Sequence, residues 1–431
     1  MKSFLPAVYV DLGKVIFGNL ARNGLRGVTK LLVAGFLGVR GMGILRSIYA
    51  IFKMVAALVD FGFNYAVLSM VPAAEARKES GEGDRILKSV LVLRILLSGV
   101  FLAAGYLLAG PIATSLLGDG GLTVWVRLSF LAVIGQSLWK FVSGHLSAGR
   151  RFNRLAFFLT TAPFLMLAAT GALILTDRFD LQGAMVIYLF APAVAVVLWW
   201  PWIDRRFLGA EWSNATTGRV LRFGRWVYLS RVAMTSRSQI NPLLLKNPAL
   251  SGSLAAGEMN AGLYAFGNEL ADELSMLTES LYMVLMPRAG GKTSPAALKG
   301  FVKRCYRNLA VLMVPLILPI FLFKPFLLLL ARIKADYIEF LPSFDVFVIL
   351  YAAGLLSLAI IPMRSALYAL ELPRVDSYLE AAGVVLLVVG GIVLIPTYGY
   401  IGAAIMALVV RALALVGLLA YGIVKLGQLD A

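Results

Sequence analysis

The chain has 431 residues, of which 60% are hydrophobic and 15% charged, with a mean hydropathy of +0.84 and a formal net charge of +17. Soluble domains carry about a quarter charged residues. The composition therefore excludes an ordinary soluble protein and indicates an all-α polytopic membrane protein. The single cysteine, Cys305, excludes an internal disulfide framework, and the single histidine, His145, argues against a histidine-based metal site. We expect no metal and no cofactor. We also expect no nucleic-acid partner, because an excess of Lys and Arg is typical of cytoplasmic loops in membrane proteins.

Twelve apolar segments are long enough to cross about 30 Å of hydrocarbon. The first six lie at 15–38, 43–70, 86–109, 122–146, 153–175 and 181–203, and the second six at 220–245, 260–287, 304–330, 341–370, 377–396 and 400–425. The longest break in hydrophobicity, residues 204–219, separates the two sets. We predict about 12 transmembrane helices in two six-helix lobes, residues 1–210 and 211–431.

The loops between these segments differ in charge. Loops rich in Lys and Arg, such as "GRRFNR" (149–154), alternate along the chain with loops that are poor in them, such as "TDRFD" (176–180). Basic loops are typical of the cytoplasmic side. The pattern therefore predicts a multi-pass protein of the bacterial plasma (inner) membrane with both termini in the cytoplasm. No loop exceeds about twenty residues, so we expect no soluble catalytic domain and no enzymatic activity.

A stripe of basic residues follows the first apolar segment. In "LARNGLRGVTK" (20–30), Arg22, Arg26 and Lys30 are spaced four residues apart and share one helical face. If this helix enters the membrane near residue 15, they lie about 10, 16 and 22 Å deep. Each costs about 2.5–3.5 kcal/mol at the centre of an inserted helix. The face must therefore border protein, water or an anionic ligand.

Further charged residues lie in other polar segments. The basic ones are Arg46, Lys53, Arg231 and Arg237, and the acidic ones are Asp60, Glu269, Asp272 and Glu273. Internal salt bridging is one interpretation of this set. The alternative is a water-filled cleft with surplus cations, which would bind anions, and phosphate most naturally, because Arg offers it planar paired donors.

The acidic cluster in the eighth segment has two interpretations of its own. Glu269, Asp272 and Glu273 are spaced i, i+3 and i+4 and share a face of a continuous helix. They would bind a coupling proton or sodium ion, or they would act as gates that pair with basic residues in one conformation. The same alternatives apply to Asp60.

Three stretches resemble the polysaccharide-transporter family, which comprises the O-antigen and exopolysaccharide flippases. They are "LGVRGMGILRSIYAIFKMVAALVDFGFNYAVL" (37–68), "AGLYAFGNELADELSMLTESLYMVLMPRAG" (261–290) and "GGIVLIPTYGYIGAAIMALVVRALALV" (390–416). The family belongs to the superfamily of the MATE drug exporters and the lipid II flippases. The seventh segment, "SRVAMTSRSQINPLLLKNP" (230–248), departs from the family's usual apolar pattern.

The resemblance implies two lobes around a central cleft, opening alternately to each side. It implies a polyprenyl-pyrophosphate-linked oligosaccharide as substrate, moved to the outer leaflet, with Arg22, Arg26 and Lys30 placed to hold the pyrophosphate. Expected partners are this lipid-linked oligosaccharide, membrane lipids, a coupling ion, and polysaccharide polymerase and assembly proteins. The alternatives are a MATE-type small-molecule or cation antiporter, which would have an acidic cleft, a membrane glycosyltransferase, which would have a large external loop, and a structural scaffold.

Overall fold

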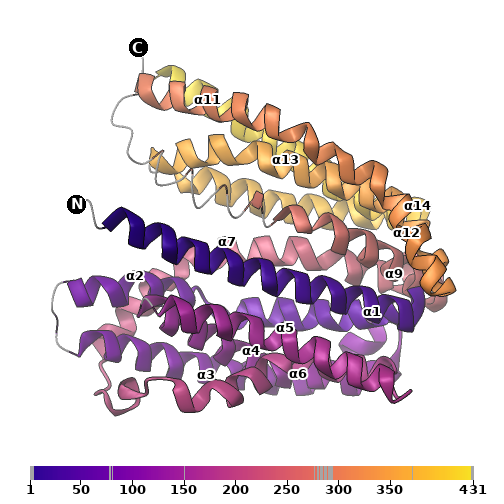
Figure 1. Ribbon diagram of the computed structural model, residues 1–431, viewed down its shortest axis with the longest axis horizontal. Helices are drawn as coiled ribbons and strands as arrows, with labels where there is room; N and C mark the ends of the chain where they lie inside the picture. Colours follow the sequence, from indigo (N-terminus) through magenta and orange to yellow (C-terminus); the bar gives the residue numbers. More distant parts are fainter. Residues whose placement is uncertain are drawn as a thin grey trace. The chain divides into compact units, whose positions relative to one another are not determined.

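The computed structural model describes residues 4–428, except 77, 78, 80, 150, 276, 279, 280, 282–284, 286–288, 290–294 and 371. For residues 4–21, Arg231 and some other positions, only the backbone belongs to the described part. The described residues form helices and their connections, and no strand occurs among them (Figure 1). The prediction of an all-α protein is confirmed.

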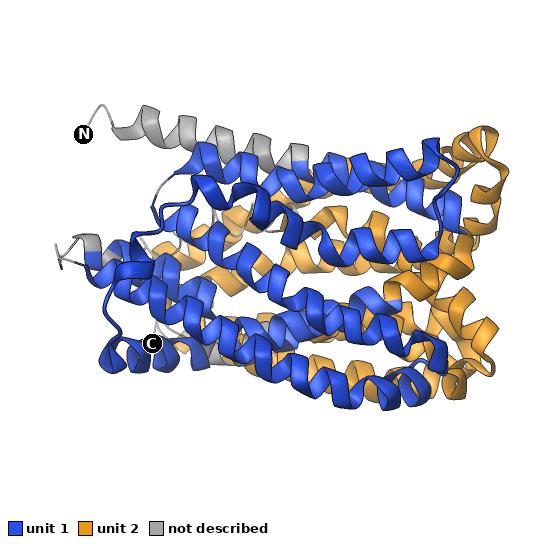
Figure 2. Ribbon diagram, turned by 90° about the horizontal axis from the view of Figure 1, so that it is seen from below, with its two compact units in different colours: residues 1–37, 47–235 blue, residues 38–46, 236–431 orange. Residues whose placement is uncertain are grey.

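The chain divides into two compact units. Unit 1 comprises Met1–Leu37 and Ser47–Thr235, and unit 2 comprises Gly38–Arg46 and Ser236–Ala431 (Figure 2). Residues 211–235 thus belong to unit 1. The predicted boundary between two lobes at residue 210 stays a prediction, because compact units are defined by packing and lobes by movement.

Unit 1 contains six complete or nearly complete helices and the first part of a seventh. They are α1 (Phe4–Asp60), α2 (Phe63–Ala76), α3 (Glu82–Pro111), α4 (Thr123–Ala148), α5 (Phe152–Leu175), α6 (Leu181–Trp199) and α7 (Asn214–Lys246). Its core contains four fully buried phenylalanines, Phe63, Phe141, Phe158 and Phe207. The core lies among α2, α3, α4, α5 and the short connection between α6 and α7.

The helix labelled α1 contains a reversal of the chain at Gly38, where φ is 66° and ψ is −178°. In Figure 1 the first arm leads away from the N-terminus, and α2 begins again near that end. Glycine adopts this positive φ without the strain that a Cβ would cause. The segments predicted at 15–38 and 43–70 thus correspond to the first arm and to the second arm with α2.

The main helices of unit 2 follow from the end of α7. They are α8 (Pro248–Ser251), α9 (Leu254–Ala271), α11 (Pro295–Met313), α12 (Leu318–Ile333), α13 (Ser343–Ala369) and α14 (Pro373–Gln428). A 3₁₀ turn at Pro315–Ile317 separates α11 from α12. The segment predicted as one helix at 304–330 is therefore interrupted, because proline lacks the N–H that would continue the helix.

The last helix, α14, also contains two antiparallel arms. The reversal is at Gly399, with φ 54° and ψ −132°. The side chain of Met406 lies against Gly390, and that of Val410 lies against Gly383. The separate segments predicted at 377–396 and 400–425 correspond to these two arms.

Eight helical stretches are long and apolar enough to span a membrane among the residues that were described. Two of them, Arg22–Asp60 and Val375–Leu426, contain the reversals at Gly38 and Gly399 and so correspond to four predicted segments. The predicted segments at 220–245 and 260–287 are not among the eight. They coincide with α7, which carries six Lys and Arg residues, and with α9 and the stretch after it.

The turn of α1, residues 38–46, packs closely on α9 within unit 2. A Cβ at Gly43 would overlap the carbonyl oxygen of Glu258, and a Cβ at Gly262 would overlap that of Val39. Two backbones approach this closely only where both helices present glycine. This packing positions the charged residues of the turn.

Candidate functional site

The predicted basic stripe lies on the first arm of α1, in unit 1. Arg22, Arg26 and Lys30 are all half-buried. Arg22 and Lys30 each interact with other groups. No ion pair joins Arg26 to any carboxylate of the described residues. The stripe therefore keeps at least one cation that no described acidic residue neutralises.

Lys53, another predicted cation, lies on the second arm of α1 and is also half-buried. Its Nζ is 5.1 Å from the centroid of the Tyr49 ring. Tyr49 in turn makes an edge contact with Tyr188 of α6, with ring centroids 5.6 Å apart. A cation over an aromatic face is stabilised by the ring quadrupole while its charge remains uncompensated.

Asp60 ends α1 and is shared by two basic residues that the sequence analysis did not select. Its Oδ1 accepts from Arg94 Nη2 of α3 at 2.6 Å, and its Oδ2 accepts from Lys140 Nζ of α4 at 3.1 Å. Arg94 also donates to the Ser137 carbonyl and lies over the Phe63 ring. The side chain of Arg94 is 1% exposed, so Asp60 is the partner that compensates its burial.

In unit 2, the predicted cation Arg46 forms an ion pair with Glu269 of α9. Glu269 is buried, whereas Asp272 and Glu273 are exposed. The reason is that α9 ends at Ala271, and the chain turns at Asp272. The single continuous acidic face that the i, i+3, i+4 spacing predicted is therefore interrupted.

A second ion-pair group anchors the turn of α1. Glu258 of α9 accepts from Arg40 of the turn and from Lys246 at the end of α7. Lys246 is fully buried and Glu258 nearly so, whereas Arg40 is 65% exposed at its side chain. Together with Arg46 and Glu269, this group holds the turn of α1 to unit 2 by charge as well as by close packing.

The largest buried charge network among the described residues of unit 2 joins the predicted cation Arg237 to residues of α13 and α14. Its members are Arg237 of α7, Arg364 of α13, and Asp376, Glu380 and Arg411 of α14. Arg364 Nη2 lies 2.7 Å from Asp376 Oδ1 and 2.9 Å from Glu380 Oε1. Arg237 Nη1 lies 2.5 Å from Glu380 Oε2, and Arg411 is more distant at 3.8 Å. These five described members are three cations and two carboxylates, with a formal charge of +1 among them.

The predicted cations thus have different environments. Arg46 and Arg237 are paired with carboxylates of their own unit, while Arg26 and Lys53 make no ion pair with any described acidic residue. The side chain of Arg231 is outside the described part. Arg94 and Lys140 could have been selected from the sequence, since both are basic residues inside apolar segments. No sequence pattern indicated that Asp60 is their common partner. The arrangement combines neutralised ion pairs with a residual excess of positive charge.

A polar hollow of about 310 Å³ lies in unit 1 where three loops rich in Lys and Arg meet. His145, Arg151, Asp204 and Arg206 are among its lining residues. Burial raises the pKa of the Asp204 carboxyl, but hydrogen bonds from the Arg206 backbone N–H and the Arg151 guanidinium outweigh it and hold the pKa below its usual value. These contacts tie the loops after α4 and α6 together.

The sequence pattern of the family described as "Polysaccharide biosynthesis protein" matches residues 12–290, well over half of the chain. The chain belongs to the polysaccharide biosynthesis protein family. The match includes the basic stripe, Asp60 and its partners, and the helices from α1 to α9. No protein of curated function matches this family member in sequence.

Solved structures show the fold of this polysaccharide biosynthesis protein. An inward-facing multidrug resistance MATE transporter of the MOP superfamily is 13% identical, with a TM-score of 0.74 and 95% of each chain covered. Lipid II flippase MurJ, in an inward closed conformation, is 12% identical, with a TM-score of 0.72 over 94% of this chain and 87% of that one. A MATE transporter of Vibrio cholerae is 17% identical, with a TM-score of 0.62 over 99% and 98%. The protein is therefore a multi-pass membrane protein with the MATE fold.

Proposed function

We propose that the protein is a membrane flippase that moves a polyprenyl-pyrophosphate-linked oligosaccharide from the cytoplasmic to the outer leaflet. The family description names polysaccharide biosynthesis, and a lipid flippase has the same fold. The head group of such a substrate carries many hydroxyls and about two negative charges, and each polar group stranded in hydrocarbon costs several kcal/mol. A hydrated basic path removes this barrier while the lipid tail stays in the bilayer.

The observation that carries the proposal is the basic stripe of α1. Arg26 is half-buried and forms no ion pair with a described carboxylate, and Arg22 and Lys30 flank it on the same helical face. Guanidinium and ammonium groups in such a position stabilise a pyrophosphate by charge-assisted hydrogen bonds. We assign Arg22, Arg26 and Lys30 to the pyrophosphate, in a cleft that opens alternately to the two sides, and Lys53 and Arg231 to the same anionic path.

The paired residues receive a different role. Arg46 with Glu269, and Asp60 with Arg94, form ion pairs in which each carboxylate is already neutralised. This favours gating over ion coupling for Asp60 and Glu269, because a carboxylate held by a guanidinium has no free oxygen pair for a sodium ion. Asp272 and Glu273, which are exposed, keep both predicted roles, gating and the binding of a coupling proton or sodium ion, and Glu273 interacts with another group. Arg237 joins the cleft only if its pair with Glu380 opens.

Energy, orientation and partners belong to the same proposal. An inside-negative potential favours outward movement of an anion by about 2.3 kcal/mol per charge per 100 mV, so we expect the potential to assist export. Because loops rich in Lys and Arg are typical of the cytoplasmic side, we propose that both termini lie in the cytoplasm and that the protein spans a bacterial plasma (inner) membrane. Polysaccharide polymerase and assembly proteins would receive the exported oligosaccharide.

A cation or drug antiporter is the alternative that the MATE fold raises. A cationic substrate requires accessible negative charge. Asp60, Glu258, Glu269 and Glu380 are each engaged by one or more basic side chains. These four carboxylates are already compensated, which favours an anionic substrate over a cationic one.

The decisive experiment is transport of a labelled undecaprenyl-pyrophosphate oligosaccharide in proteoliposomes, comparing the wild type with Arg26→Ala. We expect Arg26→Ala to insert normally and to lose most transport, and Arg26→Lys to retain part of it. Arg178→Ala is the matched control, because it removes one exposed loop arginine. Equal transport by wild type and Arg26→Ala, or transport of cationic drugs instead, would overturn the proposal.

A further inference from the structure

The first half of α11, in unit 2, carries a cluster of basic residues outside the charge networks described above. Lys303, Arg304 and Arg307 are exposed on this helix, and we call them the α11 cations. Within the part of the chain that the structure describes, none of them forms an ion pair with a carboxylate. Arg304 makes one hydrogen bond, to the Gly300 carbonyl of its own helix.

Loop arginines of unit 1 have a different environment. Arg151 and Arg206 pair with Asp204, and Arg219 pairs with Glu82. The stretch that contains the α11 cations offers no such partner, since residues 280–335 include nine Lys and Arg and no Asp or Glu. This stretch therefore presents positive charge to its surroundings.

The opposite face of α11 fixes the helix within unit 2. Leu298, Phe301 and Val302 belong to a buried apolar cluster that α11 shares with α13. The hydroxyl of Tyr306 donates to the Ala359 carbonyl of α13 at 3.0 Å. The α11 cations thus lie on the outer face of a helix that is held in place by packing and by a hydrogen bond.

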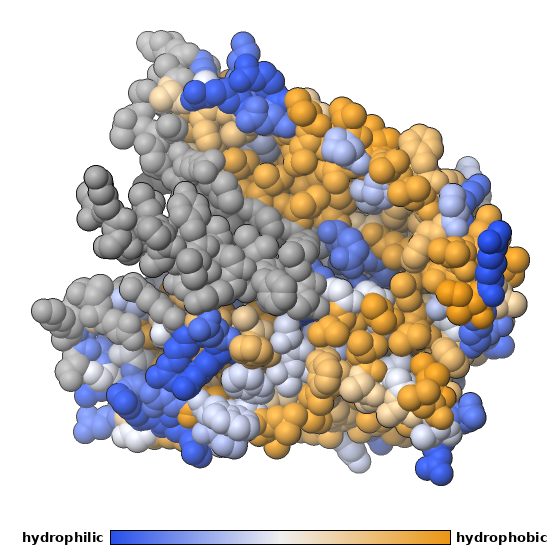
Figure 3. Space-filling view, viewed as in Figure 1, coloured by the Kyte–Doolittle hydropathy of each residue, from blue (hydrophilic) through white to orange (hydrophobic). Residues whose placement is uncertain are grey.

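The outer face of α11 changes from cationic to apolar within about one helical turn. Lys303, Arg307 and Val311 are spaced four residues apart and share this face. Val311 is 71% exposed, and Val314, which follows the helix, is 70% exposed. Figure 3 shows hydrophilic surface at the start of α11 and apolar surface along the rest of α11 and α12. Such a change marks the level at which a helix passes from lipid head groups into hydrocarbon.

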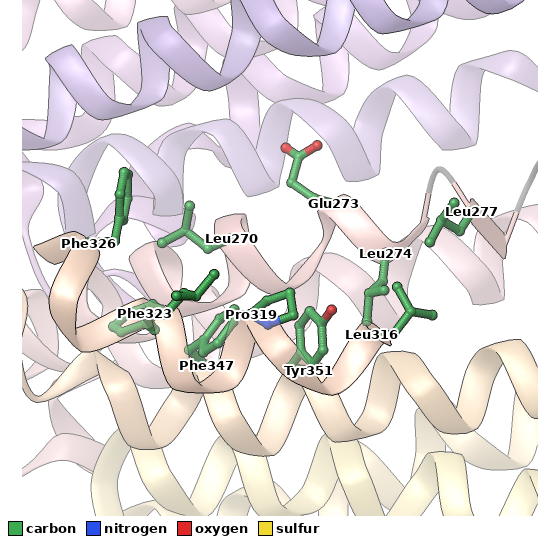
Figure 4. Close-up of a pocket in the computed structure, with 11 residues that line it drawn as sticks. Leu270, Glu273, Leu274, Leu277, Leu316, Pro319, Phe323, Phe326, Phe347 and Tyr351 are labelled. Carbon is green, nitrogen blue, oxygen red and sulfur yellow. The ribbon is translucent and has the colours of Figure 1, made fainter. Parts of the chain in front are cut away.

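The length of the apolar stretch after the cations supports this level. Residues 308–323 carry no charge, and about 25 Å of helix separate Arg307 from Lys324. Leu316 and Phe323 of this stretch line an apolar hollow (Figure 4). A hydrocarbon layer of about 30 Å fits between Arg307 and Lys324, because long basic side chains extend toward the interface.

The chemistry of this surface favours an anionic phospholipid. Side chains four residues apart lie about 5–6 Å apart, so one phosphate group can accept from both Lys303 and Arg307. A zwitterionic head group carries its own ammonium group, which the α11 cations repel. A free phosphate would leave Val311 without an apolar partner, whereas the acyl chains of a phospholipid cover it.

We propose that the α11 cations bind the head group of an anionic phospholipid whose acyl chains lie along Val311 and the apolar residues after it. From the charge pattern of the loops, this lipid belongs to the cytoplasmic leaflet. The site goes beyond the proposed function, because it does not depend on the identity of the transported substrate. It gives α11 a lipid-binding role that is separate from the basic stripe of α1.

The test is lipid retention by the full-length protein in detergent, measured by native mass spectrometry. Phosphatidylglycerol and phosphatidylcholine with identical acyl chains are compared. We expect phosphatidylglycerol to be retained at least about tenfold better, and Lys303→Gln with Arg307→Gln to abolish this preference. Arg127→Gln with Arg178→Gln is the matched control, because it removes two exposed cations of unit 1 and should leave the preference unchanged.

Equal retention of the two lipids by the wild type, or an equal loss of preference in both double variants, would overturn the proposal. If Lys303→Gln with Arg307→Gln does not insert, the wild type decides through a phosphatidylglycerol with a diazirine near the head of its acyl chain. We expect this probe to label residues 303–314, and label spread over all lipid-facing helices would overturn the proposal.

Two further outcomes separate the site from the proposed function. Retention of a polyprenyl phosphate in preference to phosphatidylglycerol would overturn the proposal and assign the α11 cations to the carrier lipid. Retention of phosphatidylglycerol requires no transport, so a protein that binds it at α11 but does not move the oligosaccharide would support this site and reject the proposed function alone.

Discussion

Lys246 and Glu258 form an ion pair in which the Lys246 Nζ lies 3.0 Å from the Glu258 Oε1 and neither side chain is more than 3% exposed. The same carboxylate accepts from Arg40 in the turn of α1. Burying an ammonium group is costly unless a partner compensates it. Glu258 therefore serves two purposes, since it neutralises the end of α7 and fixes the turn of α1 to unit 2.

The first prediction is that Glu258→Gln destabilises the protein by about 3–5 kcal/mol, the usual cost of leaving a buried charge without its partner. The measurement is the midpoint of denaturant unfolding in detergent. The double variant Lys246→Met with Glu258→Leu is the matched control, because replacing both charges by apolar groups is often nearly neutral. A Glu258→Gln variant as stable as the wild type would mean that Lys246 is compensated by another group.

The second prediction concerns the close approach of the turn to α9. Gly43→Ala places a Cβ on the Glu258 carbonyl, where no side chain can move away. We expect a loss of stability of about 1–3 kcal/mol, typical of overpacking. Gly24→Ala, in the same helix with no atom within 4 Å of its Cβ, should be neutral or stabilising. Thermal melting of both variants in detergent measures the difference, and equal melting temperatures would contradict the packing.

The helices could be placed from the sequence because hydrophobic length is a local property. The reversals at Gly38 and Gly399, each between two helical arms, also coincide with predicted breaks. Charge pairing is a different matter, because it depends on which helices meet. The partners of Asp60 come from α3 and α4, and those of Glu380 come from α7, α13 and α14. The spacing of residues along one helix does not show which other helices it will contact, so the sequence analysis missed Arg94 and Lys140.

The third prediction tests the shared carboxylate of unit 1. Asp60→Asn removes the charge that compensates both Arg94 and Lys140. Because Arg94 is fully buried, we expect a loss of about 3–5 kcal/mol in the free energy of unfolding. Lys140→Met alone should cost less, because Arg94 still neutralises Asp60 and the side chain of Lys140 is 28% exposed. Denaturant unfolding of the two variants checks the order, and a larger effect of Lys140→Met would contradict it.

The fourth prediction is a pH dependence at Asp204, outside the membrane-spanning helices. Its pKa is lowered in the folded protein by the Arg206 N–H and the Arg151 guanidinium. Because the pKa of Asp204 is lower in the folded state, the ionised carboxylate stabilises the folded protein at any pH above the unfolded-state pKa of about 3.9. This stabilisation is lost as the pH falls through the folded-state pKa. The stability difference between the wild type and Asp204→Asn should therefore be constant near neutral pH and shrink below about pH 4. Asp177→Asn, in an exposed loop, controls for loss of a loop carboxylate, and a difference that grows on acidification would refute the contacts.

The fifth prediction separates the arginines around Glu380. Arg364 Nη2 contacts both Asp376 and Glu380 within 2.9 Å, whereas Arg411 reaches Glu380 only at 3.8 Å and is 25% exposed. Arg364→Gln leaves two buried carboxylates undercompensated and should cost about 3–5 kcal/mol. Arg411→Gln removes the surplus charge and should cost less than about 1 kcal/mol. Thermal melting in detergent measures the stability of both variants. A larger loss of stability in Arg411→Gln than in Arg364→Gln would contradict the prediction and would mean that Arg411 is the main contact between α7, α13 and α14.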